Sequence, residues 1–218
     1  MRTFFRNHGL SLTMFGFFLV LLFVGQVLTG RNEYNEDRQK AGQNALGIAA
    51  YLRSSHFVEA TAENWESEFL QMGIYVFATA WLYQKGSAES KDPRKRHRHR
   101  SSRAVTADSP WPARRGGWVL RLYEHSLSLA FLALFAVAFI FHAVGGQRLY
   151  NEERLREGER VLSLIEYATS SRFWFESFQN WQSEFLAIGS MVVLSIFLRE
   201  ENSPESKEVP TPHWENEE

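Results

Sequence analysis

Two glutamates at equivalent places in two nearly identical stretches are the side chains best placed to do chemistry. Glu68 and Glu184 each belong to the pattern Asn-Trp-x-Ser-Glu-Phe-Leu, which begins at Asn64 and recurs 116 residues later at Asn180. A matched pair of carboxylates suits proton transfer between an acid and a base. Nothing else in the sequence completes such a site, so the sequence does not favour an enzyme.

Other residues that carry chemistry are scarce. The chain has no cysteine, which excludes thiolate nucleophiles, disulfides and cysteine-ligated metal. It also lacks the Gly-x-Ser-x-Gly, His-Glu-x-x-His and glycine-rich phosphate-loop patterns. His97 and His99 form only a weak metal motif, because nothing determines a third ligand. We therefore expect no catalytic residue, no metal and no cofactor.

The element that positions the two glutamates is a duplicated unit. Tyr-Asn-Glu at 34–36 recurs at 150–152, and Ser-x-Glu-Ser-Lys at 87–91 recurs at 203–207. Towards the N-terminus the spacing changes by one residue, since His8 matches His125. We divide the chain into a first copy at 1–90, a linker at 91–116, a second copy at 117–207 and a tail at 208–218.

Apolar blocks within each copy predict membrane spans, although the mean hydropathy of −0.30 is that of a soluble protein. Residues 10–28 carry no charge over about 28 Å of helix, and 126–144 repeat the pattern. A cleaved signal peptide could explain the first block but not the second. The motifs open two shorter blocks, 65–83 and 181–198. The predicted fold is therefore an all-α integral membrane protein with four spans, arranged as two tandem two-span repeats in parallel orientation.

The segments between the spans of each copy are polar, with weak helical periodicity at 31–55 and 148–172. Each is either a helix lying on the membrane surface outside the cytoplasm or a helical extension of the preceding span. His142, near the outer end of its span, is more typical of a packed or interfacial histidine than of a proton relay.

The motif residues have ordinary structural roles available. Asn64 and Asn180 are suited to cap a helix start, and Trp65 and Trp181 are suited to the headgroup region. Gly73 and Gly189 are matched within the short spans, where small residues permit close helix approach, so we expect both to face other helices.

Charge determines the expected topology. Lys and Arg concentrate in the central linker, which places it in the cytoplasm together with both termini. The linker at 91–116 should be disordered. Its basic run at 91–103 suits contact with anionic lipid, whereas nucleic acid is not expected as a partner. The acidic tail should also be disordered.

A second matched pair completes the candidate site. Arg38 and Arg154 precede the two motifs on the same predicted side of the membrane. Because carboxylates facing lipid would be costly, we expect an arginine to pair with Glu68 or Glu184 near the outer surface. The alternative is that each glutamate only complements the dipole of its own helix.

Taken together, the two copies of Tyr-Asn-Glu, Asn-Trp-x-Ser-Glu-Phe-Leu and Ser-x-Glu-Ser-Lys on a four-span frame resemble a family of uncharacterised bacterial multi-pass membrane proteins. The resemblance covers nearly the whole chain except the linker and the last residues. It implies the architecture and a bacterial inner-membrane location, and it brings no activity with it.

Three functions remain, in decreasing order of support. The first is a non-enzymatic accessory protein that interacts with lipid, with a membrane protein partner or with a second copy of itself. The second is a small transporter or channel whose pathway lies between the two repeats. An enzyme is the third.

Overall fold

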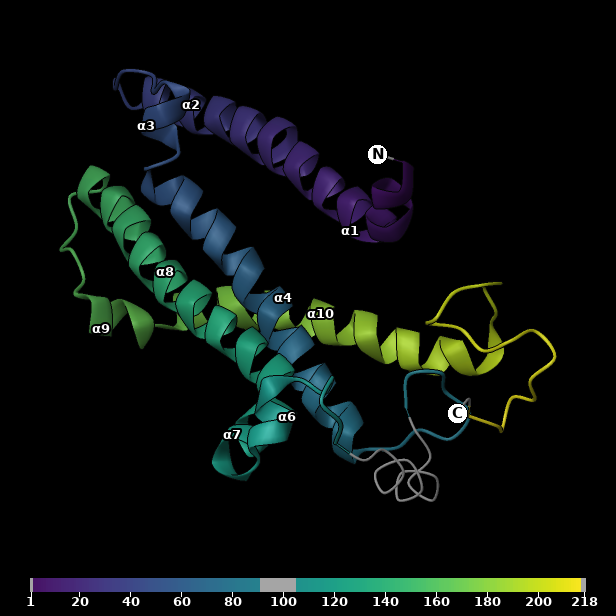
Figure 1. The fold of residues 1–218 in the computed structure, drawn as a ribbon. Helices are drawn as coiled ribbons and strands as arrows, with labels where there is room; N and C mark the ends of the chain where they lie inside the picture. Colours follow the sequence, from purple (N-terminus) through teal and green to yellow (C-terminus); the bar gives the residue numbers. More distant parts are fainter. Residues whose placement is uncertain (1, 91–104, 217–218) are drawn as a thin grey trace. The chain divides into compact units, whose positions relative to one another are not determined.

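The computed structural model describes residues 2–90 and 105–216, and for Arg2 and Thr3 only the backbone. Over these ranges all regular structure is helical and no strand occurs, as the sequence predicted (Figure 1). The elements in order are α1 (Arg2–Val20), η1 (Leu21–Thr29), α2 (Gly30–Lys40), α3 (Ile48–Tyr51), α4 (Ser55–Trp81), α6 (Trp111–Arg115), α7 (Gly117–Glu124), α8 (Ser126–Arg156), α9 (Leu164–Ala168) and α10 (Ser171–Phe197).

The first three elements form one continuous helix whose middle part, η1, is a π-helix. A π-helix has wider turns, and a single inserted residue is readily absorbed in this way. The first copy has one residue more than the second between His8 and Tyr34, and η1 lies within that interval. The corresponding helix of the second copy, α8, is α-helical throughout its 31 residues. The change in repeat spacing therefore coincides with a local change of helix type.

Among the described residues, two helices are long and apolar enough to cross a membrane, Phe4–Lys40 and Ser126–Arg156. They contain two of the four predicted spans, 10–28 and 126–144. In both copies the polar segment that follows begins as an extension of the same helix, through α2 and the end of α8. The other two predicted spans overlap α4 and α10, which have 27 residues each. These two helices carry the polar residues of the motif and are not among the helices apolar enough to cross a membrane.

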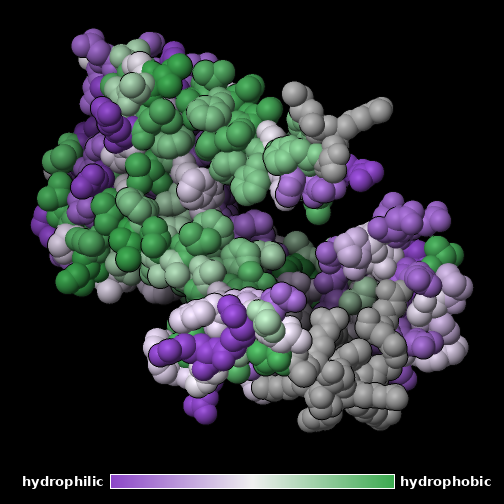
Figure 2. Space-filling view, viewed as in Figure 1, coloured by the Kyte–Doolittle hydropathy of each residue, from purple (hydrophilic) through white to green (hydrophobic). Residues whose placement is uncertain are grey.

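The apolar side chains of the two candidate spans are largely uncovered. Leu10 is 76% exposed and Phe15 68%, and on α8 Ile140 is 61% exposed. Figure 2 shows hydrophobic residues spread widely over the visible face. A core helix of a soluble protein would be mostly buried, so these helices are not of that kind.

The chain divides into two compact units, Met1–Ala62 with Ile140–Phe173 and Glu63–Phe139 with Trp174–Glu218. Each unit combines matched parts of both copies, whereas the sequence analysis divided the chain by copy. The buried core of the first unit contains Val27, Tyr34 and Tyr51.

Two segments expected to be disordered have structure where they are described. The basic run at 91–103 lies outside the described residues, but the rest of the predicted linker includes α6. In the predicted tail, residues up to Asn216 form turns, and Asn216 is buried. The tail is ordered because its side chains bond to backbone groups, as described below.

Candidate functional site

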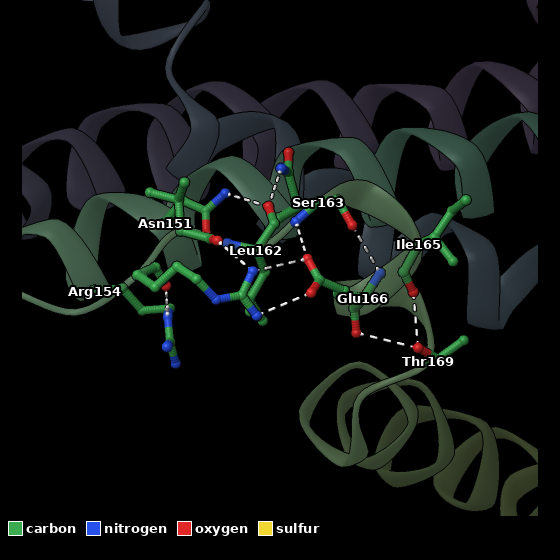
Figure 3. A network of polar contacts seen from close by, with 10 residues as sticks. Asn151, Arg154, Leu162, Ser163, Ile165, Glu166 and Thr169 are labelled. Carbon is green, nitrogen blue, oxygen red and sulfur yellow. Dashed lines mark hydrogen bonds and ion pairs between the residues drawn. The ribbon is translucent and has the colours of Figure 1, made fainter.

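In the first unit, each long apolar helix ends in a chain reversal that we call a hook: residues 34–57 form the first hook and 150–173 the second. In the first hook, Asn35 donates to the carbonyl of Leu46 at 3.0 Å and accepts from its N–H at 2.7 Å. In the second, Asn151 makes the same two bonds with Leu162, at 2.9 and 2.8 Å (Figure 3). A carboxamide can satisfy both backbone groups of one residue, so it holds the returning chain against the helix.

The two candidate arginines close the turn of their own hook. Arg38 Nε donates to the carbonyl of Asn44 at 2.9 Å, and Arg154 Nε donates to that of Arg160 at 2.5 Å. Each turn passes through a glycine in the left-handed region, Gly42 at φ +71° and Gly158 at φ +73°.

The predicted arginine–glutamate clasp would join the two units and stays a prediction, since both arginines lie in the first unit and Glu68 and Glu184 lie in the second. Within the first unit, Arg154 pairs with Glu159 at 2.9 Å. The sequence analysis matched the arginines correctly between the copies, but their observed partners are local.

Each hook buries one tyrosine against a glycine of the preceding helix. Tyr51 and Tyr167 are both 1% exposed. Their hydroxyls lie so close to Gly30 and Gly146 that a Cβ on either glycine would overlap the oxygen. Burial, with smaller contributions from Glu33 and Tyr34, raises the pKa of Tyr51 to about 12. These two glycines were not singled out from the sequence, although both follow the duplication.

The second hook has a polar network that the first lacks (Figure 3). Ser163 and Glu166 form a reciprocal capping box at the start of α9. Arg160 bonds the Glu166 carboxylate at 2.9 Å and lowers the pKa of that group to about 2, with help from Ser163. Ala50 stands at the position of Glu166 in the first hook, so α3 has no equivalent bond.

The second unit contains a row of polar contacts between α4 and α10, which we call the polar seam. Glu66 is fully buried, and its Oε1 accepts from the Ser177 hydroxyl at 2.9 Å and the Trp181 indole N–H at 3.2 Å. On either side of it along the helices, Asn180 donates to Glu63 at 2.6 Å and Gln71 donates to the carbonyl of Glu184 at 3.2 Å. Two long helices are thus joined through the motif itself.

Aromatic rings surround the indole at the centre of this seam. Trp181 lies within 5.5 to 6.3 Å, centroid to centroid, of four rings: Phe135, Phe139, Trp174 and Phe178. Its partner in the first copy, Trp65, is 41% exposed and packs on Phe69. The two tryptophans therefore have different surroundings.

The prediction that Asn64 and Asn180 cap helix starts is wrong. α4 begins at Ser55 and α10 at Ser171, well before the motif. The hydroxyls of Ser54 and Ser170 accept from the first-turn N–H groups of Phe57 and Phe173, each at 3.3 Å. A serine before each helix already supplies the cap, so the motif lies in the helix interior.

The two matched glycines differ in their contacts. A Cβ on Gly73 would meet Leu132 of α8 at 3.2 Å, as expected of a glycine at a helix contact, whereas one on Gly189 would meet nothing within 4 Å. Of the two matched glutamates, Glu68 is exposed and Glu184 half-buried. The fully buried carboxylate is Glu66, which the sequence analysis missed. The sequence pattern that could have pointed to Glu66 is the spacing of Glu59, Glu63 and Glu66, which places all three on one helix face.

The Ser-x-Glu-Ser-Lys ends form matched loops at 84–90 and 200–206. Ser90 accepts from the N–H of Gln84 at 2.9 Å, and Ser206 accepts from that of Glu200 at 2.8 Å. A second bond also recurs in both loops. The backbone N–H of Glu89 donates to the Ser87 hydroxyl at 3.1 Å, and the N–H of Glu205 donates to the Ser203 hydroxyl at 3.2 Å. The serines of the repeated pattern thus close each loop on itself.

The tail is held by two buried polar side chains. Lys207, 1% exposed, donates to the carbonyls of Pro212, His213 and Glu215 at 3.0 to 3.1 Å. Asn216 donates to three carbonyls of the first loop, those of Gln84, Ser87 and Ser90, at 2.8 to 3.0 Å. Its Oδ1 accepts from the N–H of Gly86 at 2.7 Å.

Neither unit, taken alone, gathers three metal-ligating side chains among its described residues. Within the first unit polar side chains close the two hooks, and within the second unit they join α4 to α10 and the tail to the first serine loop.

A family model described as "Domain of unknown function (DUF6766)" matches residues 1–218. No curated protein and no solved structure matches the chain.

Proposed function

The chain belongs to the family described as Domain of unknown function (DUF6766), and we propose that it is a multi-pass protein of a bacterial inner membrane that acts through interactions rather than catalysis. The observation that carries this proposal is the apolar surface of the helices Phe4–Lys40 and Ser126–Arg156, whose large side chains are exposed along their length. In lipid this exposure costs nothing, whereas in water each fully exposed large apolar side chain forgoes about 1.5–3 kcal/mol.

The proposal includes four spans in two tandem repeats. Both α4 and α10 have 27 residues, about 40 Å of helix, which exceeds the thickness of the hydrocarbon core. The polar residues that lower their hydropathy include Glu66, Gln71 and Ser177, which bond across the seam and so need not face lipid. The matched bonds of the two hooks and of the two serine loops support a common ancestry of the copies.

An interaction role is favoured over transport because the buried polar groups described above bond to one another. In the seam, carboxylate, indole, hydroxyl and carboxamide groups join α4 to α10, and aromatic rings surround Trp181. The partners of such a protein are lipid, a membrane protein or a second copy of the chain. The basic run at 91–103 would contact anionic lipid in the cytoplasm.

A transporter or channel is the alternative, and one observation favours it. A fully buried carboxylate inside a proposed span, Glu66, is the kind of residue that transport proteins use along a solute or proton path. In proteoliposomes loaded with a pH-sensitive dye, the interaction proposal predicts no proton flux above that of empty vesicles. A flux that Glu66→Gln abolishes would establish the alternative.

Membrane insertion and topology are tested together. The full-length protein should stay in the membrane pellet after extraction with alkaline carbonate. Reporter fusions at Ser102 and at the C-terminus should be active only as cytoplasmic reporters, and those at Gln43 and Glu159 only as exported ones. Release by carbonate would overturn insertion, and an exported signal at Ser102 would overturn the topology.

A further inference from the structure

The short helices before α8 present aromatic and basic side chains that no proposed role has yet used. α6 and α7 pack against each other and are separated by Gly116 (Figure 1). Gly116 and Gly117, the first residue of α7, are both at positive φ, which allows the sharp turn between the helices. Trp111 on α6 is 60% exposed and Trp118 on α7 is 75% exposed. Both helices belong to the second unit, as does the start of α8.

Three of the exposed residues of α7 share one face. Leu122, 54% exposed, follows Trp118 by four residues, and Arg121 follows it by three. Arg114 and Arg115 at the end of α6 are also exposed. Residues 111–125 thus carry three arginines against a single glutamate, Glu124. An exposed tryptophan and leucine beside cations is the composition of helices that lie in the membrane interface.

The position of this face in the chain indicates that it contacts the membrane surface. Only His125 separates α7 from α8, the helix that is apolar enough to cross a membrane from Ser126 onwards. A helix joined so closely to the start of a span must lie at the level of the lipid headgroups. There tryptophan is favoured, and arginine can extend to phosphate.

We propose that α6 and α7 form an interfacial anchor that binds the surface of an anionic bilayer, with Trp111, Trp118 and Leu122 inserted and Arg114, Arg115 and Arg121 at the phosphates. This inference rests on the proposed membrane location of the chain and adds a lipid-binding surface to it. The anchor is distinct from the basic run at 91–103, because it combines charge with apolar insertion.

The absence of native cysteine makes a direct depth measurement feasible. Single-cysteine variants Trp118→Cys, Thr106→Cys and Leu134→Cys of the full chain would carry a nitroxide in nanodiscs of phosphatidylcholine with phosphatidylglycerol. Collision rates with oxygen and with a water-soluble nickel complex report depth. We expect a deep position for residue 134, a headgroup-level position for 118 and an aqueous position for 106.

The outcomes separate this inference from the proposed function. An aqueous label at 118 with a deep label at 134 would overturn the anchor alone, while an aqueous label at 134 would overturn membrane insertion. A label at 118 that is shielded from both reagents would show that this residue packs against protein, for example a second copy of the chain, and would also overturn the anchor.

The role of charge has its own test. Replacing Arg114, Arg115 and Arg121 by glutamine should raise nickel accessibility at 118 only in discs that contain phosphatidylglycerol, since each such charge strengthens binding to anionic lipid about fivefold. The matched control is Arg53→Gln, a substitution in the other unit, which should leave residue 118 unchanged. An equal effect in discs of phosphatidylcholine alone would contradict the electrostatic part.

Discussion

The first and second hooks share a backbone frame but carry different side chains on it. Both have the asparagine that bonds a leucine, the arginine that closes the turn and the tyrosine that packs on a glycine. They differ in two respects. Only the second hook has the capping box, and the residue that lies over the ring of Tyr34 differs from the one that lies over Tyr150. His56 stacks on Tyr34 at 4.8 Å, while Arg172 lies over Tyr150 at 4.6 Å.

The same division between shared and different residues holds in the second unit. Glu66 of the first copy is fully buried in the seam, whereas its counterpart Gln182 is exposed. The tail closes only the first of the two serine loops with an asparagine. This comparison indicates that matched residues maintain the frame, and that unmatched residues such as Glu66 add contacts that one copy makes and the other does not. The predictions below test that division.

The largest effect is expected at the unmatched carboxyl group in the seam. Glu66→Ala would leave the Ser177 hydroxyl and the Trp181 indole N–H buried without their acceptor, at about 1–3 kcal/mol for each group. The matched substitution Gln182→Ala, on the surface, should change stability by less than about 0.5 kcal/mol. Unfolding by SDS titration in mixed micelles measures both.

A conservative variant sharpens this result. Glu66→Gln keeps an oxygen acceptor at the same place, so most of the stability should return. If Glu66→Ala and Gln182→Ala destabilise equally, the seam does not depend on this carboxyl group.

A shared contact should give equal effects in both hooks. Gly30→Ala and Gly146→Ala would each force a Cβ into a buried tyrosine hydroxyl, at a cost of about 1–3 kcal/mol. Removing that hydroxyl should relieve the closest overlap, so Tyr167→Phe should partly rescue Gly146→Ala, whose Cβ would still meet the ring Cζ at 3.0 Å, and should not rescue Gly30→Ala. Thermal unfolding in detergent measures the three single variants and the two double variants. Simple additivity within the matched pair would contradict the contact.

The contact of the tail with the first loop should have a smaller and local effect. Asn216→Ala removes the side chain that bonds three carbonyls and one N–H of the loop at 84–90, at about 1–2 kcal/mol. Hydrogen exchange should therefore rise in residues 84–90 and stay unchanged in the matched loop 200–206. A rise in both loops would show that the tail acts on the whole unit.

The smallest effect concerns acid. Because the folded pKa of Glu166 is lowered to about 2, its contribution to stability is present above the ordinary glutamate pKa and is lost as pH falls towards 2. The protection of the α9 amides from exchange, measured against their intrinsic rate at each pH, should thus decrease between about pH 4.5 and pH 2. α3, which has Ala50 at that place, provides the internal control. Glu166→Gln should abolish the pH dependence of α9, and a persistent dependence would assign it to another group.

Part of the candidate site was predictable because it follows the duplication. The motif residues, the two arginines and Gly73 were matched by sequence alone, and several of them lie at real contacts. The roles assigned to them were less accurate. Asn64 and Asn180 were expected to cap helices, but Ser54 and Ser170 do so. α4 and α10 begin directly after these two serines, so the motif lies in the interior of both helices.

The sequence by itself determined the helical class and the two strongly apolar helices. Each of these depends on local properties, namely composition, periodicity and the absence of helix-breaking residues within the blocks. Only the tertiary structure decided that Glu66 rather than Glu68 is buried, that Gly73 but not Gly189 contacts another helix, and that Arg154 pairs with Glu159. Burial and pairing depend on which face of a helix meets another helix, and two glutamates only two residues apart point in different directions from the same helix.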